Sequence, residues 1–120
     1  MKRYIVLIAY APRDWESPPD ALREELFAAH HAFEQYVDAR GRRLGSAALA
    51  GADTATTVRH VAGNVTVTDG PFVETTEQVG GYYDIELPDL DAAIAAGKLL
   101  PSSYAVEIRP AITIEGYESA

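Results

Sequence analysis

Three features of the sequence predict a single α+β domain with a ferredoxin-like plait over residues 1–120. The chain of 120 residues has room for one domain with one hydrophobic core. Segments with the alternation or the β-branched content of strands are interrupted by two segments with a helical period. We expect the order β-α-β-β-β-α-β, which describes a split β-α-β plait with an antiparallel sheet and an inserted hairpin.

The first strand is expected over residues 3–10, which are rich in β-branched and aromatic side chains. Both alternating sets of its residues are apolar. One set is Tyr4, Val6, Ile8 and Tyr10, and the other is Ile5, Leu7 and Ala9. Two apolar faces are typical of a strand that is buried on both sides.

A loop is expected over residues 12–19, and its end, Ser17-Pro18-Pro19-Asp20, is a favourable helix start. Residues 19–40 then carry a helical period, and Gly41 is expected to end the helix. The apolar residues of this helix fall within about 100° of one another on a helical wheel. They are Leu22, Leu26, Ala29, Phe33, Tyr36 and Val37.

The second half of the chain predicts strands, turns and one more helix. A short strand over 42–50 is followed by a hairpin over 54–60 and 65–68, with its turn at 62–64. A dense turn signal at 69–72 precedes a strand over 78–87. Pro88-Asp89 opens the second helix, which is expected to have one apolar face. That face is Leu90, Ile94, Gly97 and Leu100. The last strand is expected over 104–115, with Pro110 at a sheet edge or a bulge.

Two helices can cover only one face of such a sheet, whereas the first strand is apolar on both faces. The second face therefore needs a cover, and a second copy of the chain is the simplest one. We expect a homodimer.

Composition and charge exclude several classes of function. The chain has no cysteine, which excludes disulfides, zinc–thiolate sites and thiol catalysis. The net charge of −8, with scattered Lys and Arg, argues against a nucleic-acid partner. No segment has the roughly 18 to 20 apolar residues that cross a bilayer, so we expect no membrane partner and a cytoplasmic protein. The sequence contains no metal motif and no nucleotide fingerprint, so we expect no metal and no cofactor.

One long motif resembles a known family. The motif is Val67-Thr68-Asp69-Gly70-Pro71-Phe72-Val73-Glu74-Thr75, continued by Gln78-Val79-Gly80-Gly81-Tyr82-Tyr83. Shorter matches lie in the first strand and at 56–59, 88–93 and 106–110. Together they resemble the DGPF branch of the YCII-related proteins over nearly the whole chain.

The resemblance implies a dimeric α+β barrel in which two plait sheets face each other. It also implies a histidine that acts with an aspartate, and at least one relative looks like an enzyme that eliminates chloride from a ring lactone. The fold resembles that of muconolactone isomerase. Some relatives are encoded beside, or fused to, alternative sigma factors.

In this chain the family histidine corresponds to His30, counted eleven residues back from Gly41. On the wheel His30 lies about 80° from Leu22, at the border of the apolar stripe, with Glu34 one turn further on. A histidine held by a carboxylate can titrate near neutrality and move a proton α to a carbonyl. The same position also suits a boundary histidine in a surface ion pair. The next residue, His31, is expected to be solvated.

Asp38 and Asp69 are both candidates for the aspartate partner that the resemblance implies. Asp69 opens the turn Asp69-Gly70-Pro71-Phe72, which has two interpretations. In the structural one, Asp69 caps the turn, Gly70 supplies a strained dihedral, Pro71 fixes the next one and Phe72 anchors the loop. In the functional one, the Asp69 carboxylate lies in a cleft as orienter or base.

Candidate substrate-binding residues lie on the strands. Tyr10 and Tyr83 have apolar bodies that suit either a core or a ligand pocket. Tyr82, with Asp84 and Glu86, shares one face of its strand, and Arg109 shares a face of the last strand with Glu107. Arg109 could hold a ligand carboxylate with both nitrogens, or it could form a cross-strand ion pair with Asp84 or Glu86.

The sequence therefore favours a cofactor-independent enzyme that moves a proton within a small organic ligand, as an isomerase or lyase does. His30 would be the acid or base, Asp69 or Glu34 its orienter, and Tyr10, Tyr82 and Arg109 would bind the substrate. The alternative is a non-catalytic ligand-binding or protein-interaction module associated with sigma-factor regulation. Fold analogy does not choose between them.

Overall fold

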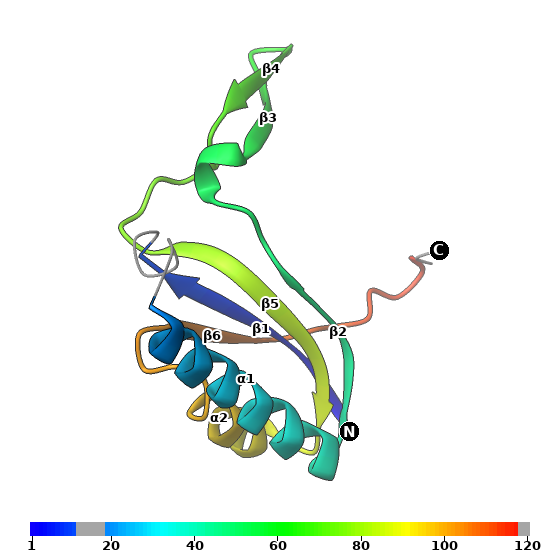
Figure 1. The fold of residues 1–120 in the computed structure, drawn as a ribbon. Helices are drawn as coiled ribbons and strands as arrows, with labels where there is room; N and C mark the ends of the chain where they lie inside the picture. The colour runs from blue at the N-terminus through cyan, green and yellow to red at the C-terminus, as the bar shows by residue number, and fades with distance from the viewer. Residues whose placement is uncertain (12–18, 118–120) are drawn as a thin grey trace.

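The computed structural model describes residues 1–11 and 19–117, and its described part is an α+β fold (Figure 1). Of the loop predicted over 12–19, residues 12–18 lie outside these residues. The elements are β1 (Lys2–Tyr10), α1 (Asp20–Arg40), β2 (Arg42–Ala48), the short 3₁₀ helix η2 (Ala52–Thr54), β3 (Thr56–Val61), β4 (Asn64–Asp69), β5 (Gln78–Leu87), α2 (Leu90–Gly97) and β6 (Ala105–Pro110). Four strands separate the helices, at the four places where strands were predicted, so the expected order written with three strands there was one strand short.

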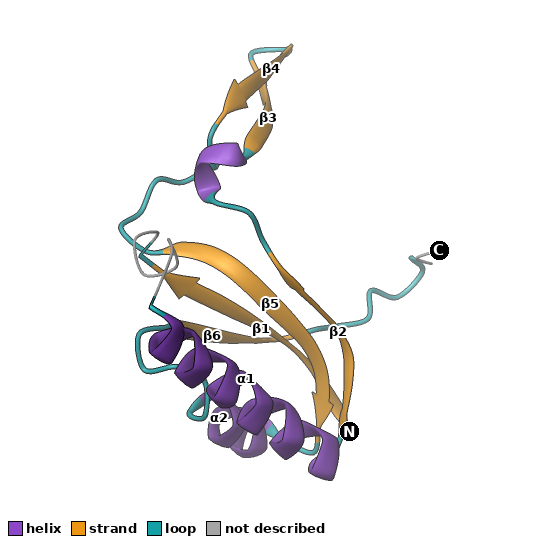
Figure 2. Cartoon of the chain, viewed as in Figure 1, coloured by secondary structure: helices purple, strands orange, loops and turns teal. Residues whose placement is uncertain are grey.

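Four of the strands form the main sheet, in the order β2-β5-β1-β6. All of its pairings are antiparallel, with β1 between β5 and β6. With the β3–β4 hairpin left aside, this is the strand order of a ferredoxin-like plait, as predicted. Both helices lie against the same face of the sheet (Figure 2).

The core lies between that face and the helices. Tyr4, Val6 and Ile8 of β1 are buried there together with Tyr83 and Ile85 of β5. The opposite set of β1 side chains, at positions 5, 7 and 9, is only half-buried in the single chain. Of the two apolar faces of β1, one is therefore covered by helices and the other has no helix over it.

Helix α1 buries Leu26, Phe33 and Val37, which belong to the predicted stripe. Leu22, in the first turn, is 40% exposed and lies at the end of this stripe. The helix ends as predicted at Gly41, whose amide donates to the Val37 carbonyl at 2.7 Å. A side chain at Gly41 would collide with the Glu86 carbonyl, so glycine lets the chain turn from the helix directly into β2.

Helix α2 uses a face that differs in part from the predicted one. Asp89 caps it, accepting a hydrogen bond from the Ala92 amide at 2.9 Å. The buried residues are Ala93 and Ala96, followed by Leu100 beyond the helix, whereas Leu90 and Ile94 are exposed. The predicted face was therefore right for Leu100 and for the half-buried Gly97, and wrong for Leu90 and Ile94, whose places the small Ala93 and Ala96 take.

The β3–β4 hairpin projects away from the main sheet (Figure 1). Its turn at Ala62 and Gly63 has two positive φ angles, 49° and 83°, as a type I′ hairpin turn requires. At its base, Gly70 has a φ of 102°, which confirms the strained dihedral expected in the turn. The Gly70 carbonyl accepts a bond from the Thr57 hydroxyl at 2.6 Å, and Arg59 donates to the Phe72 carbonyl at 2.6 Å.

Two expectations for the loops and the tail were wrong. Phe72 is 73% exposed, so its ring does not anchor the turn. The turn is held instead by the Thr57 and Arg59 side chains, which donate to the backbone carbonyls of Gly70 and Phe72. Strand β6 ends at Pro110 and not at residue 115, and Ile112 and Ile114 beyond it are exposed. Pro110 does lie on an edge strand, as predicted, because β6 pairs only with β1.

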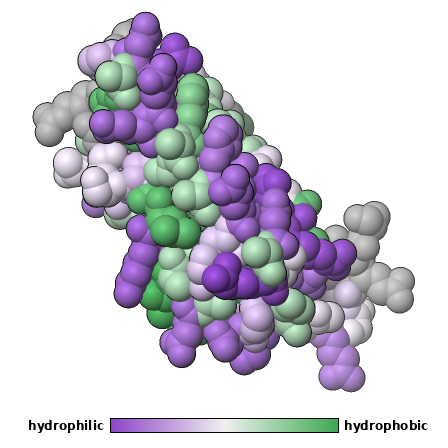
Figure 3. Space-filling view, turned by 60° about the horizontal axis from the view of Figure 1, so that its bottom comes forward, coloured by the Kyte–Doolittle hydropathy of each residue, from purple (hydrophilic) through white to green (hydrophobic). Residues whose placement is uncertain are grey.

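Among the described helices, none combines the length and the apolar character that a membrane span requires. Hydrophilic side chains cover most of the surface seen in Figure 3, with hydrophobic side chains in smaller patches between them.

Gly70→Val should lower the free energy of unfolding by about 1–3 kcal/mol, because valine is strained at a φ of 102°. Gly45→Val is the matched control, since a Cβ at Gly45 meets no atom within 4 Å and its φ is not in the left-handed region. Urea unfolding of both variants measures the difference. Equal stability of the two variants would contradict the argument.

Candidate functional site

A cavity of about 150 Å³ lies between α1 and the β2–β5 edge of the main sheet. Its polar lining consists mostly of aromatic side chains. These are His30 from α1, Tyr10 from β1, Tyr83 from β5, and Tyr104, which precedes β6. Tyr82 is also a lining residue, but it pairs with Leu7 and so has its side chain on the sheet face without helices. The rest of the lining is small or apolar: Ile8, Ser46, Ala47, Ala48, Gly80 and Gly81.

His30 bridges two tyrosines. Its Nδ1 lies 2.9 Å from the Tyr83 hydroxyl, and its Nε2 lies 2.9 Å from the Tyr104 hydroxyl. The ring of Tyr104 stands edge-on to the imidazole, at 5.5 Å between centroids. Both ring nitrogens are therefore engaged, which fixes the orientation of the imidazole.

A carboxylate sets the direction of these bonds. The Tyr83 hydroxyl donates its proton to Oε2 of Glu34 at 2.7 Å. An ionised carboxylate only accepts hydrogen bonds, so the Tyr83 oxygen must in turn accept from Nδ1–H of His30. In the neutral imidazole Nε2 is then an acceptor, and the Tyr104 hydroxyl donates to it. We call Tyr104, His30, Tyr83 and Glu34 the relay, since each member donates to the next.

Arg43 of β2 holds the acidic end of the relay. Its Nη1 lies 3.2 Å from Oε1 of Glu34, the oxygen that Tyr83 does not use. Its Nε and Nη2 donate to both oxygens of Asp38, at 2.9 and 3.0 Å. Asp38, one of the two predicted aspartate partners, thus orients Arg43 and is linked to His30 only through Arg43, Glu34 and Tyr83.

Burial shifts the pKa values of His30, Tyr83 and Tyr104 so that the uncharged form of each side chain is favoured. It lowers the pKa of His30 below 6.5, against the raising influence of Glu34 and together with a smaller lowering by His31. Burial also raises the pKa of Tyr104 to about 12, with a further contribution from Tyr10. For Tyr83, burial and then the bond to Glu34 raise the pKa far above that of an ordinary phenol. At neutral pH His30 is therefore an uncharged base between two protonated phenols.

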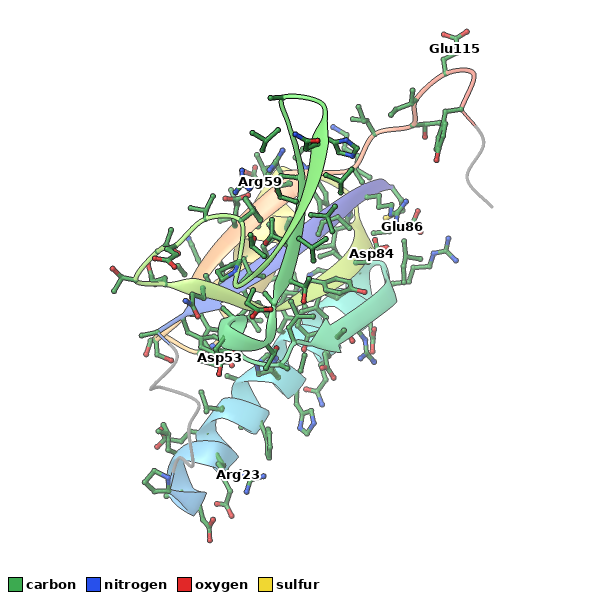
Figure 4. The ribbon with its side chains drawn as sticks, turned by 90° about the horizontal axis from the view of Figure 1, so that it is seen from above. Arg23, Asp53, Arg59, Asp84, Glu86 and Glu115 are labelled. Carbon is green, nitrogen blue, oxygen red and sulfur yellow. The ribbon has the colours of Figure 1, made fainter. Side chains whose placement is uncertain are left out.

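Tyr10 forms the boundary between this cavity and a wider depression of about 940 Å³. The two share Tyr10, Ala48 and Gly80. The Tyr10 ring packs directly over Gly80, where any Cβ would overlap it, and 5.3 Å from the Tyr104 ring. Asp53 and Glu74 line the wider depression, and Figure 4 shows Asp53 near the base of the hairpin.

The structure brings the side chains of His30 and Tyr10 to one cavity, which Tyr82 also lines, but not Asp69 or Arg109. Asp69 ends β4 in the hairpin, is exposed, and is absent from the lining of both cavities. Arg109 is exposed on β6 and contacts Glu107 at 3.5 Å. His31 is exposed, as predicted.

The alternative cross-strand ion pair of Arg109 was wrong. Asp84 instead binds Arg3, at 2.7 Å, and Glu86 binds Arg42. Figure 4 shows Asp84 and Glu86 close together on the sheet. In the antiparallel register, Arg3 and Arg42 both lie directly opposite Glu86, so they reach these carboxylates before Arg109 does.

The sequence interpretation missed Tyr104 and Arg43. The alternation of the last strand places Tyr104 on the same side as Val106 and Ile108. That pattern does not show, however, that the Tyr104 hydroxyl contacts His30. Arg43 follows Gly41 by two residues, and only the turn at Gly41 brings it back beside Glu34.

The part of the chain that the structure describes holds no group of three or more His, Asp or Glu side chains arranged to bind a metal ion.

Comparison with known proteins gives a family and one relative. The chain matches the YCII-related domain over residues 2–111. It is 41% identical over 80 residues to an uncharacterised protein of Rhizobium meliloti (strain 1021). That match covers 63% of this chain and 64% of the relative, so it spans a little less than two thirds of either protein.

Proposed function

The chain belongs to the family of YCII-related domain proteins, and we propose that it is a cofactor-independent enzyme that moves a proton within a small carbonyl compound. The observation that carries this proposal is the relay at the cavity wall. A neutral imidazole lies there in a fixed orientation, with a carboxylate two hydrogen bonds away.

In this proposal His30 is the base. Its lowered pKa keeps it uncharged at neutral pH, so Nε2 has a lone pair for a proton. The imidazolium that forms is stabilised through Nδ1–H, because Tyr83 passes the influence of the Glu34 charge to it. Glu34 takes the orienting role that the sequence offered to either Asp69 or Glu34. A role for Asp69 stays a prediction without a contact to support it.

The lining of the cavity favours an uncharged substrate. No Lys or Arg is among its lining residues, all of which lie in the described part of the chain, and much of the lining is aromatic or aliphatic. An anion would enter without a cation to pair with it, at a high desolvation cost. A ketone or lactone instead presents an apolar body and one carbonyl. Tyr10 remains a candidate binding residue, whereas substrate binding by Tyr82 and binding of a carboxylate by Arg109 stay predictions.

The proposal includes three finer statements. The Asp69-Gly70-Pro71-Phe72 turn supports membership of the DGPF branch. The half-buried Ile5, Leu7 and Ala9, on the sheet face without helices, support a homodimer formed through that face. A cytoplasmic location completes the proposal, and cell fractionation tests it.

A non-catalytic interaction module, as in sigma-factor regulation, remains the alternative function. The β3–β4 hairpin supports it, because Val58, Val61, Val65 and Val67 are all exposed on an element that projects from the sheet. Such a module needs no proton transfer, so the experiment below separates the two functions.

His30→Asn should lower the rate of proton transfer by about 10²–10⁴-fold, because it removes the base and keeps a polar side chain. The rate is measured by NMR as deuterium uptake from heavy water into acetylacetone, a γ-lactone and a β,γ-unsaturated cyclohexenone. His31→Asn is the matched control, since it makes the same change at the next, exposed residue. Wild-type protein with no uptake above that of buffer for any compound, or His30→Asn with unchanged uptake, would refute the proposed enzyme.

The homodimer predicts a sedimentation mass of twice that of the chain at micromolar concentration, with more than about 1,000 Å² buried in total. Leu7→Lys should give monomers, because it places a charge on the sheet face without helices. Leu22→Lys, on α1, should stay dimeric. A monomeric wild-type protein would rule out this assembly.

A further inference from the structure

The two hydrogen bonds that His30 already makes limit how a substrate proton can reach its ring nitrogens. An imidazole has two ring nitrogens, and here both have a tyrosine hydroxyl at 2.9 Å. Nδ1 carries its own proton toward Tyr83, so it has no lone pair to offer. Nε2 has the lone pair, but the Tyr104 hydroxyl already occupies it. While the relay is intact, a substrate therefore meets no unoccupied nitrogen of His30.

The two tyrosines differ in what they can offer to a ligand. Tyr83 is buried, donates its proton away from the cavity to Glu34, and accepts from His30. Tyr104 is half-buried and lines the cavity, and its proton points to Nε2. A hydroxyl oxygen can accept as well as donate, so the Tyr104 oxygen can take a proton as it passes its own to His30.

We propose that Tyr104 is the catalytic residue that exchanges the proton with the substrate. His30 accepts the proton that Tyr104 gives up and later returns it. This inference rests on the proposed function and names the group that touches the substrate. It also assigns Tyr83 as a positioning residue, which keeps the proton of neutral His30 on Nδ1.

The step balances without any further reactant. A C–H bond α to the substrate carbonyl breaks, and its electron pair stays in the substrate as an enolate. The proton forms a new O–H bond on Tyr104, while the original O–H bond breaks and its proton forms Nε2–H of His30. The reverse transfer to another carbon of the enolate returns both side chains to their starting state and yields an isomer.

The environment of Tyr104 requires the two transfers to be coupled. Its pKa, raised to about 12 by burial and by Tyr10, makes a standing phenolate rare at neutral pH. Tyr104 can therefore act as a base only while Nε2 removes its proton. The orientation of the Tyr104 hydroxyl toward Nε2 at 2.9 Å meets this requirement.

The test compares Tyr104→Phe with wild-type protein and with Tyr36→Phe, using deuterium uptake by the three carbonyl probes above. Tyr36 lies on α1, has Arg40 over its ring, and does not line the cavity, so its variant controls for the loss of a tyrosine hydroxyl. We expect Tyr104→Phe to lose about 10²-fold or more in uptake, and Tyr36→Phe to keep the wild-type rate. Near-ultraviolet circular dichroism checks the fold, and Tyr104→Leu removes the hydroxyl through a second side chain.

The outcomes separate the two claims. Loss of uptake in both Tyr104 variants, with His30→Asn also inactive and Tyr36→Phe active, supports the inference. Uptake that persists in Tyr104→Phe but is lost in His30→Asn overturns the inference and leaves the proposed function standing. Wild-type protein without uptake on any probe overturns both.

Discussion

The hydrogen bond from Tyr83 to Glu34 sets the direction of every other bond in the site. Because a carboxylate accepts and does not donate, the 2.7 Å contact assigns the Tyr83 proton, then the Nδ1 proton of His30, then the donor role of Tyr104. Without Glu34 the two tyrosines and the histidine could reverse their bonds, and Nε2 would carry the proton. The chemistry proposed for the cavity therefore depends on one carboxylate that lies outside its lining.

The fold supplies this carboxylate through contacts between elements that are distant in the sequence. Glu34 and His30 lie one turn apart on α1, and Phe33 between them is fully buried and packs on the Tyr83 ring at 4.5 Å. Gly41 then lets β2 start immediately after the helix, so that Arg43 returns to the same helix and binds Glu34. Packing thus fixes the rotation of α1 against β5, and the relay follows from that rotation.

The sequence predicted the parts of the site that depend on local periodicity. The helical period placed His30 at the border of the buried stripe with Glu34 one turn on, because residues four apart share a helix face. It could not place Tyr83 between them, since that depends on how β5 packs against α1. The same limit explains α2, where large apolar residues predicted the buried face, but close packing selected Ala93 and Ala96. Asp69 and Arg109 had suitable chemistry, and only the tertiary fold shows that neither lines the cavity.

The nitrogen-15 NMR spectrum of the His30 ring tests the central claim most directly, since it reports which nitrogen carries the proton. The account predicts a pKa below 6.5, and above that pKa a neutral ring with the proton on Nδ1. In Glu34→Gln the pKa should fall further, because the charge that stabilises the imidazolium is lost, whereas Glu24→Gln, an equal loss of charge elsewhere on α1, should leave it unchanged. A neutral wild-type His30 with its proton on Nε2 would contradict the account.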